Sequence, residues 1–197
     1  MAGPKFARED GCDFAIALGG GSVMDAAKAL AGMGVNDGDL WDYILFGKGG
    51  KKPFKNPALP LVAISTTAGT GSELDAGGVI TNPETNEKTA VFGESLFPVL
   101  AVVDPKLTLT VLPRFTAYQG FDAPFHSLEG YISIEANPMS DLYALGAIEN
   151  ISHYLPRAVR DGSDLEAREH VSFGNSLSGM VMTVGSCATE HSREHAV

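Results

Sequence analysis

The sequence has 197 residues, 44% of them hydrophobic and 19% charged, with a formal net charge of -10. This composition indicates a folded globular protein, and the acidic balance argues against nucleic acid as a partner, because phosphate binding needs clustered Lys and Arg. No apolar run approaches the roughly 20 residues of a membrane helix, and the first ten residues lack the apolar core of a signal peptide. We therefore expect no membrane association. The two cysteines, Cys12 and Cys187, lie far apart in sequence, so we expect no disulfide framework and a reducing cytoplasm.

The first recognisable unit is a strand followed by a glycine turn and a helix. Residues 13–18 (DFAIAL) form a short apolar run, as expected of a parallel strand buried on both faces. Gly19, Gly20, Gly21 and Ser22 follow, and then a strongly helical stretch. The glycines would let a ligand approach the backbone, Ser22 could cap the helix, and the helix N-terminus could bind a phosphate. The pattern is not GxGxxG, and a tight turn without a ligand explains it equally well.

A second strand with a polar loop follows a connecting segment. Residues 36–60 are rich in Gly, Lys and Pro and predict a loop with one helical turn, after which residues 59–65 (LPLVAIS) predict a buried strand. The loop TTAGTGSE (residues 66–73) offers hydroxyl groups and backbone N–H groups to a pyrophosphate or ribose, or simply caps a helix. Two such loops after consecutive strands favour a ligand site at the carboxyl end of an open α/β sheet.

A hairpin and a third strand complete this half. Residues 77–92 read as two strands joined by a turn at residues 82–86, with Lys88 at the base of the returning strand. Lys88 could reach a ribose hydroxyl or a phosphate, or it could be a solvated lysine at a strand end. Residues 99–104 (VLAVVD) predict a third buried strand.

After Pro113 the pattern becomes helical, with breaks expected at residues 137–138, around Pro156 and at residues 161–163. We therefore predict a partial α/β dinucleotide-binding domain over residues 1–110 and a partial all-helical domain over residues 111–197. No internal repeat or low-complexity segment is seen.

The helical half contains a candidate pair of metal ligands. Gly120 reads as a helix start, and Phe121, Phe125, Leu128 and Ile132 recur at helical spacing, as expected of an inward-packing face. Asp122 and His126 are four residues apart, so a carboxylate and an imidazole share one helix face and could bind a divalent metal. The alternative is an Asp favoured by the helix dipole and a buried structural His.

A second pair, His191 and His195, lies at the end of the sequence in EHSREH and also has i, i+4 spacing. Ser192 follows the first histidine, so the metalloprotease motif HExxH is absent and a zinc hydrolase is disfavoured. Two solvated histidines at a polar helix end remain the alternative.

Taken together, four motifs resemble the iron-containing alcohol dehydrogenases. They are GGGSVMDAAK, TTAGTGSE, GFDAPFHSLEGY and EHSREH, in the order and at about the spacing of that family. The resemblance implies a dehydroquinate-synthase-like architecture of two domains, an α/β nucleotide-binding domain followed by an all-α metal-binding domain, with the active site between them. It also implies hydride transfer between NAD (or NADP) and a primary or secondary alcohol or aldehyde at Fe(II), with Zn(II) in some members, and a homodimer.

The resemblance also implies roles for individual residues. Asp122, His126 and His191 match metal ligands, and His195 matches a catalytic histidine near the nicotinamide that relays a proton. The remaining matches contact the cofactor: Gly20, Gly21, Ser22, Asp25, Thr66, Thr67, Thr70, Ser72 and Lys88.

Compared with the family pattern, the sequence lacks the opening βα units, a fourth metal-ligand histidine and the later helices. We therefore expect an internal fragment of a longer dehydrogenase that has weak or no turnover alone, and a sheet with one exposed edge and one uncovered face. Two alternatives remain: a dehydroquinate-synthase-like lyase that uses NAD and a metal, and a non-catalytic nucleotide-binding remnant.

Overall fold

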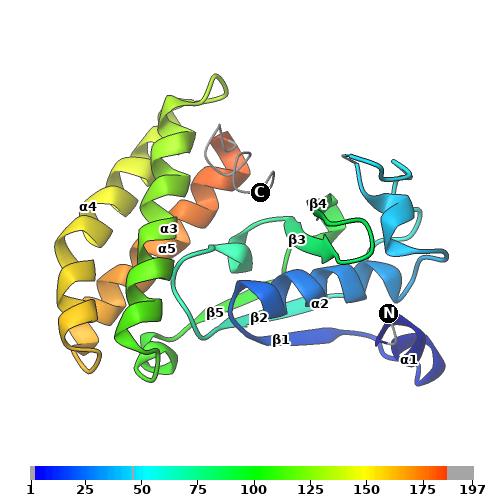
Figure 1. The fold of residues 1–197 in the computed structure, drawn as a ribbon, viewed down its shortest axis with the longest axis horizontal. Coiled ribbons are helices and arrows are strands. Elements are labelled where there is room, and N and C mark those ends of the chain that lie inside the picture. The colour runs from blue at the N-terminus through cyan, green and yellow to red at the C-terminus, as the bar shows by residue number, and fades with distance from the viewer. Residues whose placement is uncertain (1–2, 46, 186–197) are drawn as a thin grey trace.

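The first half of the chain contains a three-stranded parallel sheet (Figure 1). The structure is a computed structural model that describes residues 3–45 and 47–185. Its strands are β1 (Ala15–Gly19), β2 (Leu61–Ser65) and β5 (Leu100–Val103), with β2 in the middle. The ends of each strand lie within two residues of the ends of the apolar run that predicted it. Gly19 pairs with Ser65, so the carboxyl ends of β1 and β2 are neighbours.

The two faces of this sheet differ in burial. Helix α2 (Gly21–Met33) covers one face, where Met24 packs with Ala17, Leu61 and Ala63. On the other face Ile16, Leu18 and Leu100 are 57%, 60% and 54% exposed. The prediction that these strands are buried on both faces is therefore wrong for this face, because no described element packs across it. The expected edge at β1 and the expected uncovered face are confirmed.

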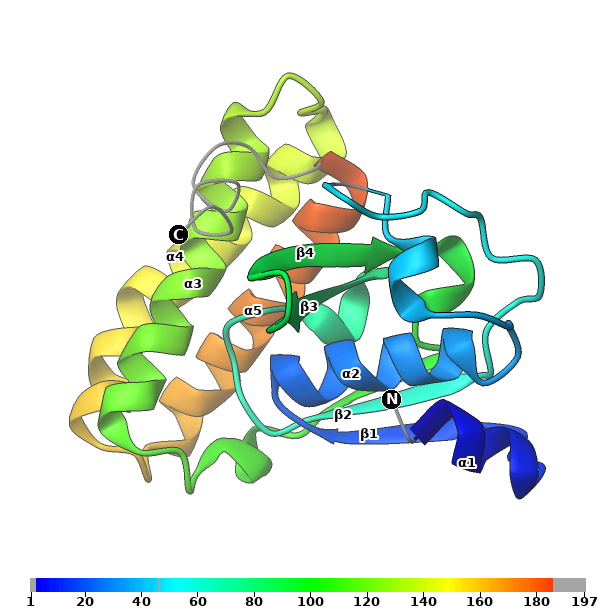
Figure 2. The same ribbon diagram turned by 45° about the vertical axis from the view of Figure 1, so that its right-hand side comes forward.

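Helix α2 lies between this sheet and an antiparallel hairpin, as Figures 1 and 2 both show. The hairpin consists of β3 (Gly77–Asn82) and β4 (Glu87–Phe92), as predicted. Its contact with α2 is close: a Cβ on Gly78 would lie 3.1 Å from the Cα of Asp25. The second core of this half fills the space on that side of α2, and it contains Ala29, Met33, Tyr43, Ile44, Val91 and Leu96.

Short helical segments connect these elements. A seven-residue helix, α1 (Gly3–Glu9), precedes β1, and the loop before β2 contains the expected single turn, η1 (Leu40–Tyr43). Three further 3-10 turns follow: η2 (Ser72–Leu74), η3 (Glu94–Leu96) and η4 (Pro105–Thr108).

Three long helices make up the second half: α3 (Pro113–Ile132), α4 (Pro138–Arg160) and α5 (Leu165–Gly185). They enclose a core of six buried side chains: Ala123, Ile151, Leu155, Ala158, Ala167 and Val171. The predicted breaks at residues 137–138 and 161–163 are confirmed. The break expected at Pro156 is wrong, because α4 continues through it while the adjacent Leu155 packs in the core. Among the described helices, none is long and apolar enough to cross a bilayer.

Two expectations about α3 are also wrong. The helix begins at Pro113, whose fixed backbone angle suits a first helical position, and Gly120 lies in its middle, where a Cβ would meet Leu155 at 2.2 Å. The predicted apolar face points outward, since its members are 38% to 68% exposed: Phe121, Phe125, Leu128 and Ile132. The inward face carries mainly small residues, which let α4 and α5 pack closely.

Candidate functional site

The glycine turn connects β1 directly to α2. Gly20 is the N-cap residue of α2 and has extended backbone angles, but no side chain caps the helix. The proposed Ser22 cap is therefore wrong: Ser22 lies inside the first helical turn and is exposed. The first backbone N–H groups of a helix have no intrahelical acceptors. The turn can thus present N–H groups and the positive end of the helix dipole to a phosphate.

The loop after β2 packs tightly against this turn. Thr66 N donates to Gly19 O at 3.0 Å, and a Cβ on Gly20 would lie 2.8 Å from Thr67 Oγ1. A Cβ on Gly21 would lie 2.6 Å from the Thr70 methyl carbon. The glycines therefore allow the two loops to touch each other. The structure brings Gly20 and Gly21 of the turn together with Thr66, Thr67 and Thr70 of the loop, at the carboxyl ends of neighbouring strands.

Below these two loops lies a buried ionic network that the sequence motifs do not predict. Lys28 on α2 is fully buried, and its Nζ donates to Ser72 Oγ (2.8 Å), Asp75 Oδ1 (2.7 Å) and Gly77 O (2.7 Å). Its three N–H donors are thus all used. The only sign of this network in the sequence is the i, i+3 spacing of Asp25 and Lys28 on α2. The hydrogen-bond partners of Lys28 are 44 to 49 residues away in sequence.

Two of the predicted cofactor-binding residues belong to this network. Ser72 Oγ donates to Asp25 Oδ1 at 2.8 Å, and Asp25 Oδ2 accepts from Val79 N at 3.1 Å. Burial raises the pKa of Asp25 despite these hydrogen bonds, and it also raises the pKa of Asp75 despite the adjacent Lys28 ammonium. Asp25 and Ser72 thus bind other parts of the chain and join α2, the loop after β2 and the hairpin.

Lys88, the predicted ribose contact, lies on the hairpin. It is half-buried on β4 and pairs in register with Thr81 of β3. The structure thus places Lys88 on the element that covers α2, separate in sequence from both loops.

The candidate metal ligands Asp122 and His126 lie on one face of α3. His126 Nδ1 is 3.9 Å from Asp122 Oδ1, and their side chains are 8% and 33% exposed. An imidazole nitrogen and a carboxylate oxygen at this separation are donors that Fe(II) and Zn(II) both accept, so the pair fits such an ion. His191 and His195 lie outside the described residues. Within residues 3–45 and 47–185, no three His, Cys, Asp or Glu side chains group closely enough to bind a metal.

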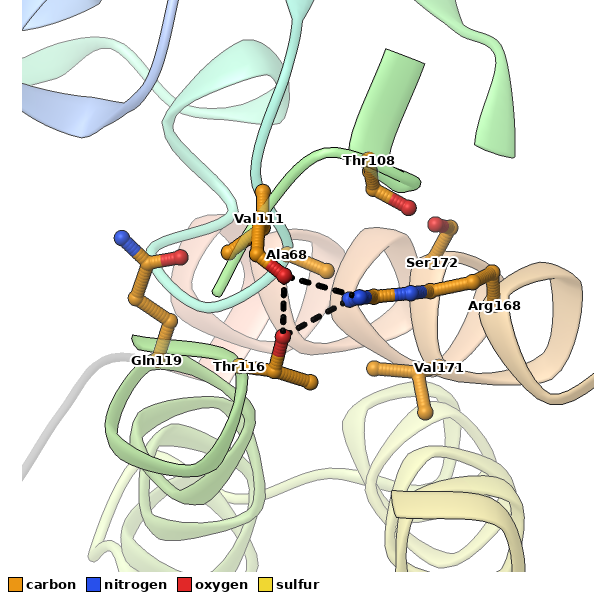
Figure 3. Close-up of a pocket in the computed structure, with 8 residues that line it drawn as sticks. All are labelled: Ala68, Thr108, Val111, Thr116, Gln119, Arg168, Val171 and Ser172. Atoms are coloured by element: carbon orange, nitrogen blue, oxygen red, sulfur yellow. Dashed lines mark hydrogen bonds between the residues drawn. The ribbon is translucent and has the colours of Figure 1, made fainter. Parts of the chain in front are cut away.

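A second buried cation, Arg168 on α5, lies where the loop after β2 meets the helices (Figure 3). Its guanidinium donates to Thr116 Oγ1 (2.8 Å), Val111 O (3.1 Å) and Gly162 O (3.1 Å). Beside it is a cavity of about 10 Å³, enough for one water molecule, which Ala68 also lines. This cavity is too small for a substrate, so we assign Arg168 to joining α3 and α5.

Comparison with known proteins agrees with this geometry. Residues 1–105 match the family model of iron-containing alcohol dehydrogenase, and residues 116–197 match the C-terminal model of the same family. The chain belongs to the iron-containing alcohol dehydrogenase family. Its fold is accordingly the α/β nucleotide-binding and helical architecture of that family, represented here in part.

Individual relatives agree with the family match. The NAD-dependent methanol dehydrogenase of Bacillus methanolicus is 37% identical over 96% of this chain and 49% of that protein. Sulfoacetaldehyde reductase from Bifidobacterium kashiwanohense, solved in complex with NAD+, superposes with a TM-score of 0.90 at 35% identity, over 96% of this chain and 50% of that one. The archaeal Red Sea brine pool alcohol dehydrogenase ADH/D1 gives 0.94 at 37% identity, over 98% and 49%. The chain thus spans about half the length of the relatives it matches.

Proposed function

We propose that the chain belongs to an oxidoreductase that transfers a hydride between NAD and a primary or secondary alcohol or its aldehyde at a metal ion. The single observation that supports this most strongly is the loop surface. The glycine turn and the Thr-rich loop pack against each other at the ends of adjacent strands, where open α/β sheets bind nucleotides. The lyase alternative is not favoured, because the curated relatives are dehydrogenases.

In this proposal the loop surface binds the cofactor. The N–H groups of Gly20, Gly21 and Ser22 at the start of α2 bind the pyrophosphate, and the hydroxyl groups of the second loop orient the nicotinamide half. Asp25 and Ser72 fix these loops through the Lys28 network, and Lys88 contacts the ribose. The second-loop residues in question are Thr66, Thr67 and Thr70.

Asp122, His126 and His191 would bind the metal, which we take to be Fe(II), with Zn(II) as the alternative. A divalent ion with one carboxylate ligand and neutral imidazoles polarises a bound alcohol or carbonyl oxygen. His195 would move the proton near the nicotinamide. His126 is buried, which restricts its ring, and Asp122 is the more exposed of the two side chains.

The proposal also includes three properties that follow from the family resemblance and the composition. They are a homodimer, a cytoplasmic location and a division between the two domains at residues 110–111, just before α3. NADP remains the alternative to NAD.

Two measurements on the 197-residue chain test the proposal: metal analysis of protein purified without oxygen, and NADH binding. We expect near-stoichiometric iron or zinc that Asp122→Ala and His191→Ala both abolish. Glu169→Ala, which removes an exposed helical carboxylate on α5, should leave the metal content unchanged. Metal retained in both ligand variants would refute the ligand assignment, and absence of both metal and NADH binding would favour a non-catalytic remnant.

A further inference from the structure

Helix α5 makes specific polar contacts with the loop after β2. Asn175 on α5 is 1% exposed; its Oδ1 accepts from Gly71 N at 3.0 Å, and its Nδ2 donates to Glu73 Oε1 at 2.9 Å. Glu73 is also 1% exposed. The amide side chain of Asn175 therefore satisfies a buried backbone donor and a buried carboxyl group of the same loop. If the amide is removed, neither group can form a hydrogen bond with water instead.

The backbones of the loop and the helix also touch. Gly71 has a φ of 62°, and a Cβ on it would lie 2.7 Å from the Cα of Gly179. A Cβ on Gly179 would in turn lie 2.6 Å from Gly71 O. One turn further along α5, Thr183 Oγ1 donates to Leu74 O at 2.7 Å. Because Gly71 and Gly179 bring the two backbones into direct contact, a shift of α5 must move the loop with it.

The same stretch of α5 contacts the helical turn that carries Asp122 and His126. Ser178, three residues after Asn175, lies 2.7 Å from Ser127 Oγ and donates to Ala123 O at 2.8 Å. Ala123 and Ser127 directly follow the two candidate metal ligands in sequence. Residues 175–179 therefore touch the candidate cofactor loop on one side and the candidate metal turn on the other.

We propose that Asn175 is a positioning residue that couples cofactor binding to metal binding, an inference that depends on the proposed function of the two sites. The coupling is carried by one rigid helix whose position both sites share. Such coupling is reciprocal: if the metal tightens NADH binding by some factor, NADH must tighten metal binding by the same factor. Asn175 is thus expected to affect binding at both sites without touching either ligand.

The test uses the 197-residue chain, NADH and Zn(II), a redox-stable probe for the metal site. NADH affinity is measured with and without Zn(II), and Zn(II) affinity with and without NADH. We expect each ligand to tighten the other in the wild type. Asn175→Ala leaves the Gly71 N–H and Glu73 without their partner, so NADH binding should weaken by roughly tenfold and the mutual effect should fall towards none.

A charge-exchange pair distinguishes positioning from general damage. Asn175→Asp sets two carboxyl groups against each other and should behave like Asn175→Ala. Adding Glu73→Gln restores a donor opposite Asp, because a Gln amide can donate to it while Asp still accepts from Gly71 N. The double variant should therefore regain the mutual effect of the two ligands.

Asn36→Ala is the matched control, since Asn36 is 2% exposed and its side chain makes four hydrogen bonds near α2, away from α5. It should lower stability and leave the mutual effect intact. A folded Asn175→Ala with the wild-type mutual effect, or a wild type whose ligands bind independently, would overturn the coupling but not the proposed function.

A wild type that binds no NADH would overturn the proposed function instead. Hydrogen exchange then decides the role of Asn175 without any ligand. Faster exchange than in Asn36→Ala, in the loop of residues 66–73 and in the turn of residues 122–127 together, supports the positioning role. Equal exchange in the two variants refutes it.

Discussion

Two buried cations lie on either side of the loop after β2, and they are stabilised in opposite ways. Lys28 on α2 pairs with Asp75 at 2.7 Å, with Asp25 one hydroxyl group away through Ser72. Arg168 on α5 donates to two backbone carbonyls and a Thr hydroxyl, all neutral. A compact ammonium concentrates its charge and needs an anion when buried, whereas a delocalised guanidinium loses less hydration and can use several neutral acceptors. The loop after β2 is therefore held to α2 and the hairpin by an ionic network, whereas Arg168 connects α5 to the segments around it through neutral acceptors.

The largest effect should come from Lys28→Met. This substitution leaves Asp75 and Asp25 in a largely buried site without their cation, and breaking such a pair costs about 3 kcal/mol or more. Urea unfolding should show this loss of unfolding free energy. Lys5→Met, whose side chain is 76% exposed, is the control and should change stability by less than about 0.5 kcal/mol. A small effect at Lys28 would mean that the network contributes little to stability.

Arg168→Met should cost less, about 2 kcal/mol, because it leaves only neutral acceptors, and a water molecule in the adjoining cavity can reach them. Arg168→Lys should recover little of this loss, since one ammonium cannot reproduce the fork of donors. Urea unfolding measures the loss of stability in both variants, and Arg160→Met, at an exposed position, is the control. The contrast between the two cations fails if Arg168→Met costs more than Lys28→Met.

The sequence predicts those parts of the molecule that depend on neighbouring residues. The strand, glycine turn and helix from Ala15 to Met33 follow from a short apolar run and a helical composition, and the hairpin follows from its turn residues. The Asp122 and His126 pair was predicted from i, i+4 spacing alone, and the structure places the two side chains 3.9 Å apart. Residues four apart in a helix share one face whichever element the helix packs against, so this prediction needs only local sequence.

The remainder depends on contacts between distant segments. The role of Lys28 needs partners from the loop and the hairpin, and that of Asn175 needs a loop more than 100 residues away in sequence. The orientation of α3 was predicted wrongly because bulky side chains at helical spacing suggest a core face. Here small residues such as Ala123 and Ser127 face the partner helices, and Phe121 and Ile132 point outward.

The smallest effect concerns pH, and it should appear on substitution of Glu73 but not of Arg168. Burial raises the pKa of Glu73 above its ordinary value of 4.5. The folded state then binds this proton more tightly than the unfolded chain, so the contribution of Glu73 to stability is fully present below pH 4.5 and is lost as the pH rises through the folded pKa. Glu73→Gln keeps the acceptor for Asn175 and carries no charge, so its unfolding free energy relative to wild type should increase over that window and then level off. Arg168→Met removes no carboxyl group and should keep the wild-type pH dependence. Urea midpoints from pH 4 to pH 8 test both, and a constant difference between Glu73→Gln and wild type would show that Glu73 does not titrate with folding.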